Sequence, residues 1–140
     1  MILAMLCVYM AAGASKERVL VDQEVQVIRG DFKEFHFLVA EDAADGAQFL
    51  GNFKTQGGFN DDLTFYVLTK DNFVRWYSHR KHESVLMFER KKEGIFQFKA
   101  KPGETYYFVL DNFFSTVSHK MQRPYIYLVV IGDSRHGAAR

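Results

Sequence analysis

Regularly spaced turn residues constrain the fold of this chain more than any other feature. Gly57-Gly58, Gly94, Pro102-Gly103 and Asn112 separate segments in which apolar and polar residues alternate. Gly and Asn accept the backbone angles that tight turns require, and a period of two residues is typical of a strand with one buried face. The sequence therefore predicts antiparallel sheets whose neighbouring strands are joined by short turns.

The expected fold class is all-β, a two-sheet antiparallel β-sandwich that is jelly-roll-like. About eight strands fit the alternation and the turn spacing, at residues 24–28, 32–39, 48–55, 63–68, 84–88, 94–100, 104–110 and 124–131. The segment 63–68 is apolar on both faces, which indicates a central strand. Gly51 is expected to mark a bulge or a close backbone approach. The side chains expected to be mainly buried are Phe35, Phe37, Phe65, Phe96, Phe98, Phe108 and Ile126.

Length and composition exclude several classes of protein. A chain of 140 residues has the size of one domain and is long enough for a core. Its 48% hydrophobic and 16% aromatic content excludes intrinsic disorder for most of the chain. The formal net charge of +1 argues against a dedicated nucleic-acid-binding protein, because phosphate binding requires a surplus of Lys and Arg.

The N-terminal segment predicts export. Residues 1–14 form an uncharged apolar run that ends in Ala12-Gly13-Ala14, which fits a signal peptide and its cleavage site. The run is shorter than the roughly 20 residues of a membrane-spanning helix, so no transmembrane span is expected. The alternative is that residues 1–10 are a buried first strand or helix of the domain. We expect a secreted, periplasmic or lumenal protein with its sandwich in residues 15–133 and a disordered tail at 134–140.

A set of turn glycines and strand aromatics resembles a known family. The set comprises Gly57-Gly58-Phe59-Asn60-Asp61, Gly94-x-Phe96-x-Phe98, Gly103-x-x-Tyr106-x-Phe108, Asn112, Ser115-Thr116 and Lys120. It resembles the GOLD (Golgi dynamics) domain of lumenal cargo receptors and is similar to the pre-peptidase C-terminal β-sandwich of secreted prokaryotic proteins. The chain departs from the cargo receptors at Val109, where they carry a cysteine. The resemblance implies a non-enzymatic β-sandwich that binds a protein or accompanies a larger exported partner.

Residues that could carry chemistry each have a simpler interpretation. His79 and His82 have a spacing seen in metal sites, but their cationic neighbours oppose a divalent ion, which favours a solvated loop. Ser115 and His119 could belong to a hydrolase triad, but Ser115 lacks the sharp turn that surrounds a nucleophilic serine. Five Asp and Asn residues could either bind calcium or form Asx turns, and Asx turns are favoured. They are Asn60, Asp61, Asp62, Asp111 and Asn112. We therefore expect no enzymatic activity, no metal and no cofactor.

Two segments are the candidates for binding a partner. Asp71-Asn72 is expected to cap one short helical turn that carries Phe73, Trp76 and Tyr77. The second segment is Phe113-Phe114. Two adjacent aromatic side chains cannot both point inward easily, so one of them is exposed as an anchor or caps the core. Trp, Tyr and Arg are enriched at binding hot spots. The expected partner-binding residues are Arg75, Trp76, Tyr77, Arg80, Phe113 and Phe114.

Two classes of partner remain open. The preferred partner is a protein that contacts these two loops or a strand edge. The second class is a carbohydrate or a lipid head group, for which Trp76, Tyr77 and Tyr66 would form a stacking platform. Planar aromatic rings exposed on one face would favour the second class, and a hydrophobic strand edge would favour the first.

Overall fold

The computed structural model describes residues 17–28, 30–41, 47–56, 63–113 and 125–133. These ranges contain eight strands and one helix: β1 (Glu17–Gln26), β2 (Phe32–Leu38), β3 (Gln48–Gln56), β4 (Leu63–Thr69), α1 (Lys70–Tyr77), β5 (Leu86–Lys91), β6 (Glu93–Lys99), β7 (Thr105–Asp111) and β8 (Tyr125–Asp133). All eight strands overlap those expected from the sequence. β1 starts earlier than expected. A register shift between Val19 and Val21 interrupts the alternation in the first part of this strand, so the pattern did not predict that part.

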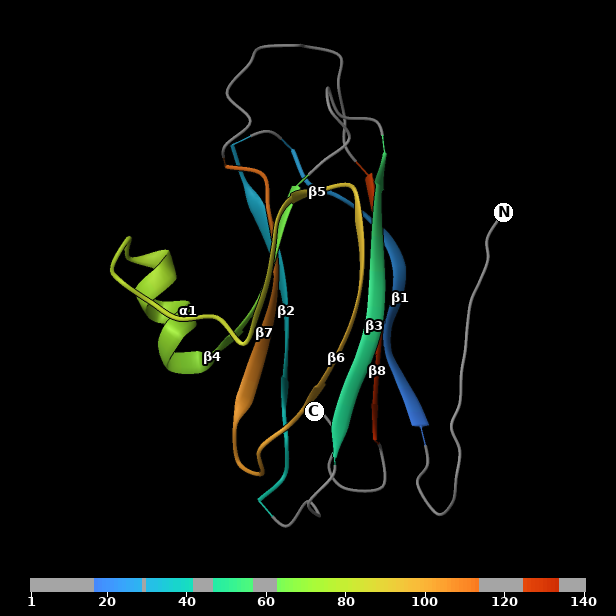
Figure 1. Cartoon of the computed structure of the whole chain (residues 1–140), viewed down its shortest axis with the longest axis vertical. Coiled ribbons are helices and arrows are strands. Elements are labelled where there is room, and N and C mark those ends of the chain that lie inside the picture. Colours follow the sequence, from blue (N-terminus) through green and yellow to red (C-terminus); the bar gives the residue numbers. More distant parts are fainter. Residues whose placement is uncertain (1–16, 29, 42–46, 57–62, 114–124, 134–140) are drawn as a thin grey trace.

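The strands form two antiparallel four-stranded sheets. The first sheet has the order β1-β8-β3-β6 and the second has the order β2-β7-β4-β5. Figure 1 shows the two sheets face to face, with α1 lying against the outer side of the second sheet. Apart from β4 and β5, strands that follow each other in sequence lie in different sheets. This strand order is that of a jelly roll, and the expected all-β sandwich is confirmed.

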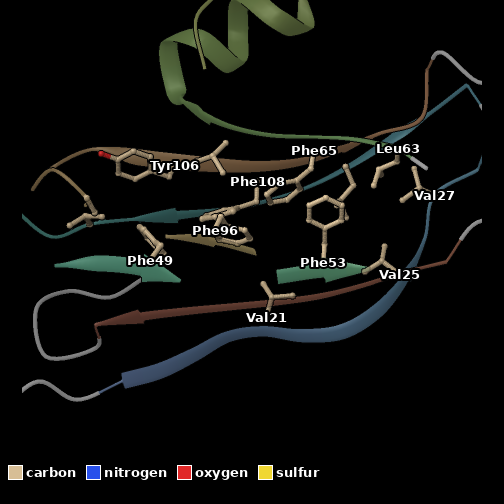
Figure 2. Packing of buried hydrophobic residues seen from close by; sticks show 14 of the residues in the cluster. Val21, Val25, Val27, Phe49, Phe53, Leu63, Phe65, Phe96, Tyr106 and Phe108 are labelled. Carbon is tan, nitrogen blue, oxygen red and sulfur yellow. The ribbon is translucent and has the colours of Figure 1, made fainter. Parts of the chain in front are cut away.

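Phenylalanine rings fill the space between the sheets. Phe53 of the first sheet stacks on Phe65 of the second with ring centroids 4.9 Å apart, and Phe65 also lies 5.2 Å from Phe96. Figure 2 shows these rings, together with Phe108, between the two layers. Burying each such ring contributes about 1.5–3 kcal/mol, so this aromatic layer is a major source of stability.

The expected core residues agree with this packing where the structure describes them. Phe65, Phe96 and Phe108 are buried. Three others are partly buried against the core, namely Phe35, Phe37 and Phe98. The side chain of Ile126 lies outside the described residues.

β4 is a central strand, as its two apolar faces indicate. It lies between β7 and β5, and its inward residues are Leu63, Phe65 and Val67. Of the two interpretations of Gly51, the bulge is wrong, because β3 pairs in unbroken register with both β6 and β8. Hydrogen bonding on both sides holds Gly51 in a regular ladder.

The Pro-Gly turn before β7 forms as expected. The Glu104 backbone N–H donates to the Lys101 carbonyl at 3.2 Å, and Gly103 has φ of +82°. Pro at the second position and Gly with positive φ at the third are the requirements of a type II turn. None of the helices in the described ranges is long and apolar enough to cross a membrane.

Candidate interaction surface beside the helix

Helix α1 begins directly at the end of β4. Thr69 is its N-cap residue and has an extended backbone. The Asn72 amide nitrogen donates to the Thr69 hydroxyl at 3.1 Å, while the Asn72 Oδ1 accepts the Glu83 backbone N–H at 3.0 Å. The expected cap at Asp71-Asn72 is therefore wrong, because no loop separates strand and helix. Asn72 instead ties the start of the helix to the chain that leaves it.

Trp76 anchors α1 to the second sheet. Its side chain is only 8% exposed and packs with Leu68 and Val109. Its ring meets Phe32 edge-on at 5.1 Å and lies 5.7 Å from Tyr66. Trp76 lies on the helical turn that the sequence predicts, but the helical spacing turns its side chain toward the sheet and not toward a partner. Trp76 thus supports the surface and does not form it.

Phe113 connects the two candidate segments of the sequence. Its ring lies 5.9 Å from Trp76 and 5.6 Å from Phe32, and its side chain remains 42% exposed. The two segments therefore meet on the outer side of the second sheet (Figure 1), although they are far apart in sequence. Phe114 lies outside the described residues.

Three rings from β2, α1 and the turn after β7 form what we call the aromatic patch: Phe32, Tyr77 and Phe113. Tyr77 is 61% exposed and lies 5.9 Å from Phe32. Val74, one turn earlier on α1, is also exposed. The sequence reasoning missed Phe32 as a site residue. Its signal was present, because Phe32 is out of phase with the inward Phe35 and Phe37 and so faces the opposite side of the sheet.

The chain that follows α1 is held in a defined geometry. The Arg80 N–H donates to the Arg75 carbonyl at 2.8 Å, and the His79 N–H donates to the Trp76 carbonyl at 3.0 Å. These two hydrogen bonds form a Schellman motif in which His79, with φ of +59°, occupies the left-handed position. Arg75, Arg80 and Lys81 are exposed around this turn. The motif therefore presents cations next to Tyr77 on a fixed backbone.

A buried carboxyl group lies beneath the aromatic patch. Asp111 is 7% exposed and stands opposite Phe32 on one side and Thr64 on the other. Its Oδ1 accepts the Phe113 N–H at 2.8 Å. Burial raises the pKa of Asp111, and the Phe113 hydrogen bond opposes that rise. Burial also raises the pKa of Tyr66; the charge of Asp111 raises it further, and a hydrogen bond with the Trp76 side chain lowers it.

The candidate chemistry of the sequence is only partly within the described residues. Asp111 forms the Asx turn that was favoured over calcium binding, because its carboxylate accepts a backbone N–H two residues ahead. His82 Nδ1 lies 3.2 Å from the Arg80 carbonyl oxygen. No group of three or more His, Cys, Asp or Glu side chains suited to a metal ion occurs among the described residues. Outside those residues lie Asn60, Asp61, Asp62, Ser115 and His119.

Comparison with protein-family models and curated proteins gives no family for this chain. No protein-family model matches the chain. A search of curated proteins likewise finds no match.

Proposed function

We propose that this protein is an exported, non-enzymatic β-sandwich module that binds another protein through the aromatic patch. The observation that carries the proposal is the convergence of β2, α1 and the end of β7, which places Phe32 5.9 Å from Tyr77 and 5.6 Å from Phe113. Tyr77 and Phe113 are nevertheless exposed. Clustered exposed aromatic side chains leave apolar surface in water and are common anchors at protein interfaces.

The orientation of the rings favours a protein over a carbohydrate. A sugar ring stacks on a flat aromatic face, but Phe32 is inclined by 65° to Tyr77 and by 54° to Phe113. Trp76 and Tyr66, expected to complete a stacking platform with Tyr77, are respectively buried and partly buried where α1 packs on the sheet. Tilted rings in contact with one another form an uneven apolar surface, which suits an apolar side chain that packs against them. A carbohydrate- or lipid-binding role is the alternative.

Two further features support an exported interaction module. The resemblance to GOLD and pre-peptidase C-terminal domains implies a β-sandwich that accompanies or binds other exported proteins. The apolar residues 1–14 support export. N-terminal sequencing of secreted or periplasmic material should give a start at or near Ser15. Recovery of the intact chain from the cytoplasm alone would contradict export without affecting the binding proposal.

Selection from a random-peptide phage library on the immobilised full-length chain tests the binding function. Tyr77→Ala should weaken binding of the selected peptides by at least about 2 kcal/mol, as expected for a hot-spot residue. The melting temperature of the Tyr77→Ala protein should stay unchanged, because the Tyr77 side chain is largely exposed. Phe113→Ala should act in the same direction.

Trp76→Ala is the matched structural control. It removes a buried ring, so the free energy of unfolding should fall by about 3 to 5 kcal/mol. The proposal is wrong if Tyr77→Ala and Phe113→Ala leave the affinity of the folded protein unchanged. A glycan array probed with the same variants tests the alternative, which would be supported by glycan binding that both substitutions abolish.

A further inference from the structure

We propose that the partner segment is an acidic peptide carrying a bulky apolar side chain, which enters the aromatic patch while its carboxylates face the cations beside it. This inference rests on the proposed function and specifies the chemistry of the partner. It is carried by the charges that adjoin the patch on α1, β2 and β7.

The cations beside the patch are available to a partner. Arg75, Arg80 and Lys81 are all exposed, and none forms an ion pair with another described residue. The Schellman motif fixes the backbone at Arg75 and Arg80. The Asn72–Glu83 hydrogen bond fixes the chain just after Lys81. A partner therefore meets a preorganised set of positive charges, which reduces the entropy lost on binding.

Three acids near the patch are engaged within the fold. Asp111 is buried and accepts the Phe113 N–H, and Asp31 accepts the Phe32 N–H at 2.8 Å. Glu34 lies 3.0 Å from His36 Nδ1. Asp71 and Glu83 are exposed as well, so residues 70–83 expose four cations and two acids and carry a net positive charge. Opposite charges steer and select partners, whereas like charges exclude them.

The arrangement suits a linear peptide more than a membrane surface. Tyr77, Arg80 and Lys81 follow one another where the chain leaves α1, so two of the cations and one ring of the patch lie along a single stretch of backbone. An extended acidic segment can follow this stretch while one of its side chains packs against Phe32 and Phe113.

The peptides selected from the phage library provide the first test. They should contain an excess of Asp and Glu over the unselected library, together with a large apolar residue. Replacing the Asp and Glu of the strongest peptide by Asn and Gln should weaken its binding to the full-length chain about tenfold. The affinity should also fall as the salt concentration rises, because exposed charge pairs are screened.

A charge reversal on the protein provides the second test. The double variant Arg75→Glu/Arg80→Glu should lose at least about tenfold in affinity for the acidic peptide and should lose the salt dependence. Lys99→Glu/Lys101→Glu is the matched control, because these exposed lysines lie near the opposite end of β7 and should not affect binding. Melting temperatures of both variants show whether each is folded.

The outcomes separate this inference from the proposed function. Peptides that require Tyr77 but show no acidic excess, or no response to charge reversal, overturn the acidic partner and leave the protein-binding module standing. Failure to select any peptide counts against both. Binding to phosphatidylserine vesicles that needs Arg75 and Arg80, without peptide binding, would assign the surface to a membrane and overturn both.

Discussion

The side chain of Asn112 donates from Nδ2 to the Val27 carbonyl at 3.1 Å, across 85 positions of sequence. Val27 begins the connection that carries the chain from β1 in the first sheet to β2 in the second. The Asn112 backbone holds the same connection, since its N–H donates to Asp31 and its carbonyl accepts the Gly30 N–H, both at 3.0 Å. Asn112 therefore fixes the end of β7 against the start of β2, which sets Phe113 beside Phe32.

Asn112→Ala should lower the free energy of unfolding by about 1 to 3 kcal/mol, because the buried Val27 carbonyl loses its side-chain donor. Urea denaturation followed by tryptophan fluorescence measures the change. Gln97→Ala is the control, since it removes an exposed side-chain hydrogen bond to Gln48 and should have little effect. Equal stability of the two variants would show that Asn112 does not hold the connection.

Gly94→Ala should destabilise the fold by overpacking the core. A Cβ at this position would stand 2.6 Å from Phe53 Cε1 and 2.8 Å from the Phe88 ring. Forcing a methyl group into such a site costs about 1–3 kcal/mol. Adding Phe88→Leu should recover part of this loss, so the double variant should be more stable than the sum of the single effects predicts. Strict additivity would exclude a clash with Phe88.

The strands could be predicted because their signal is local, whereas the aromatic patch depends on contacts distant in sequence. The apolar run at residues 63–68 and the Pro102-Gly103 turn are each specified within a few residues, and both predictions are confirmed. The burial of Trp76 could not be predicted, because it depends on Leu68 and Val109, which the fold brings beneath α1. The contact of Phe113 with Phe32 requires the pairing of β2 with β7, and no local pattern specifies that pairing.

His79→Gly should stabilise the protein by about 1 kcal/mol, because a non-glycine residue with positive φ crowds its own Cβ against the backbone. The gain is reduced by the greater freedom of glycine in the unfolded chain. Thermal unfolding measures it. His82→Gly is the control: His82 lies nearby without positive φ, so glycine there should be neutral or destabilising. A loss of stability in His79→Gly would show that the histidine side chain contributes more than its backbone costs.

Asp111→Asn should change how stability depends on pH. Burial raises the pKa of Asp111 in the folded protein above its ordinary value of 3.8. Between 3.8 and that raised value the folded state retains a proton that the unfolded state has lost, so this carboxyl makes stability fall as pH rises through the window. Above the window the cost of burying the charge is present in full.

The asparagine variant cannot ionise, yet its side-chain oxygen can still accept the Phe113 N–H. Denaturation curves from pH 3 to 8 should therefore show a variant that is more stable than the wild type at neutral pH, with the difference shrinking as the pH falls toward the ordinary pKa of 3.8. Asp31→Asn is the matched control, because Asp31 also accepts a backbone N–H but is less buried than Asp111. If Asp111→Asn were instead less stable than the wild type at neutral pH, the charged carboxylate would be stabilising the fold. Its favourable interactions would then outweigh the cost of burying its charge.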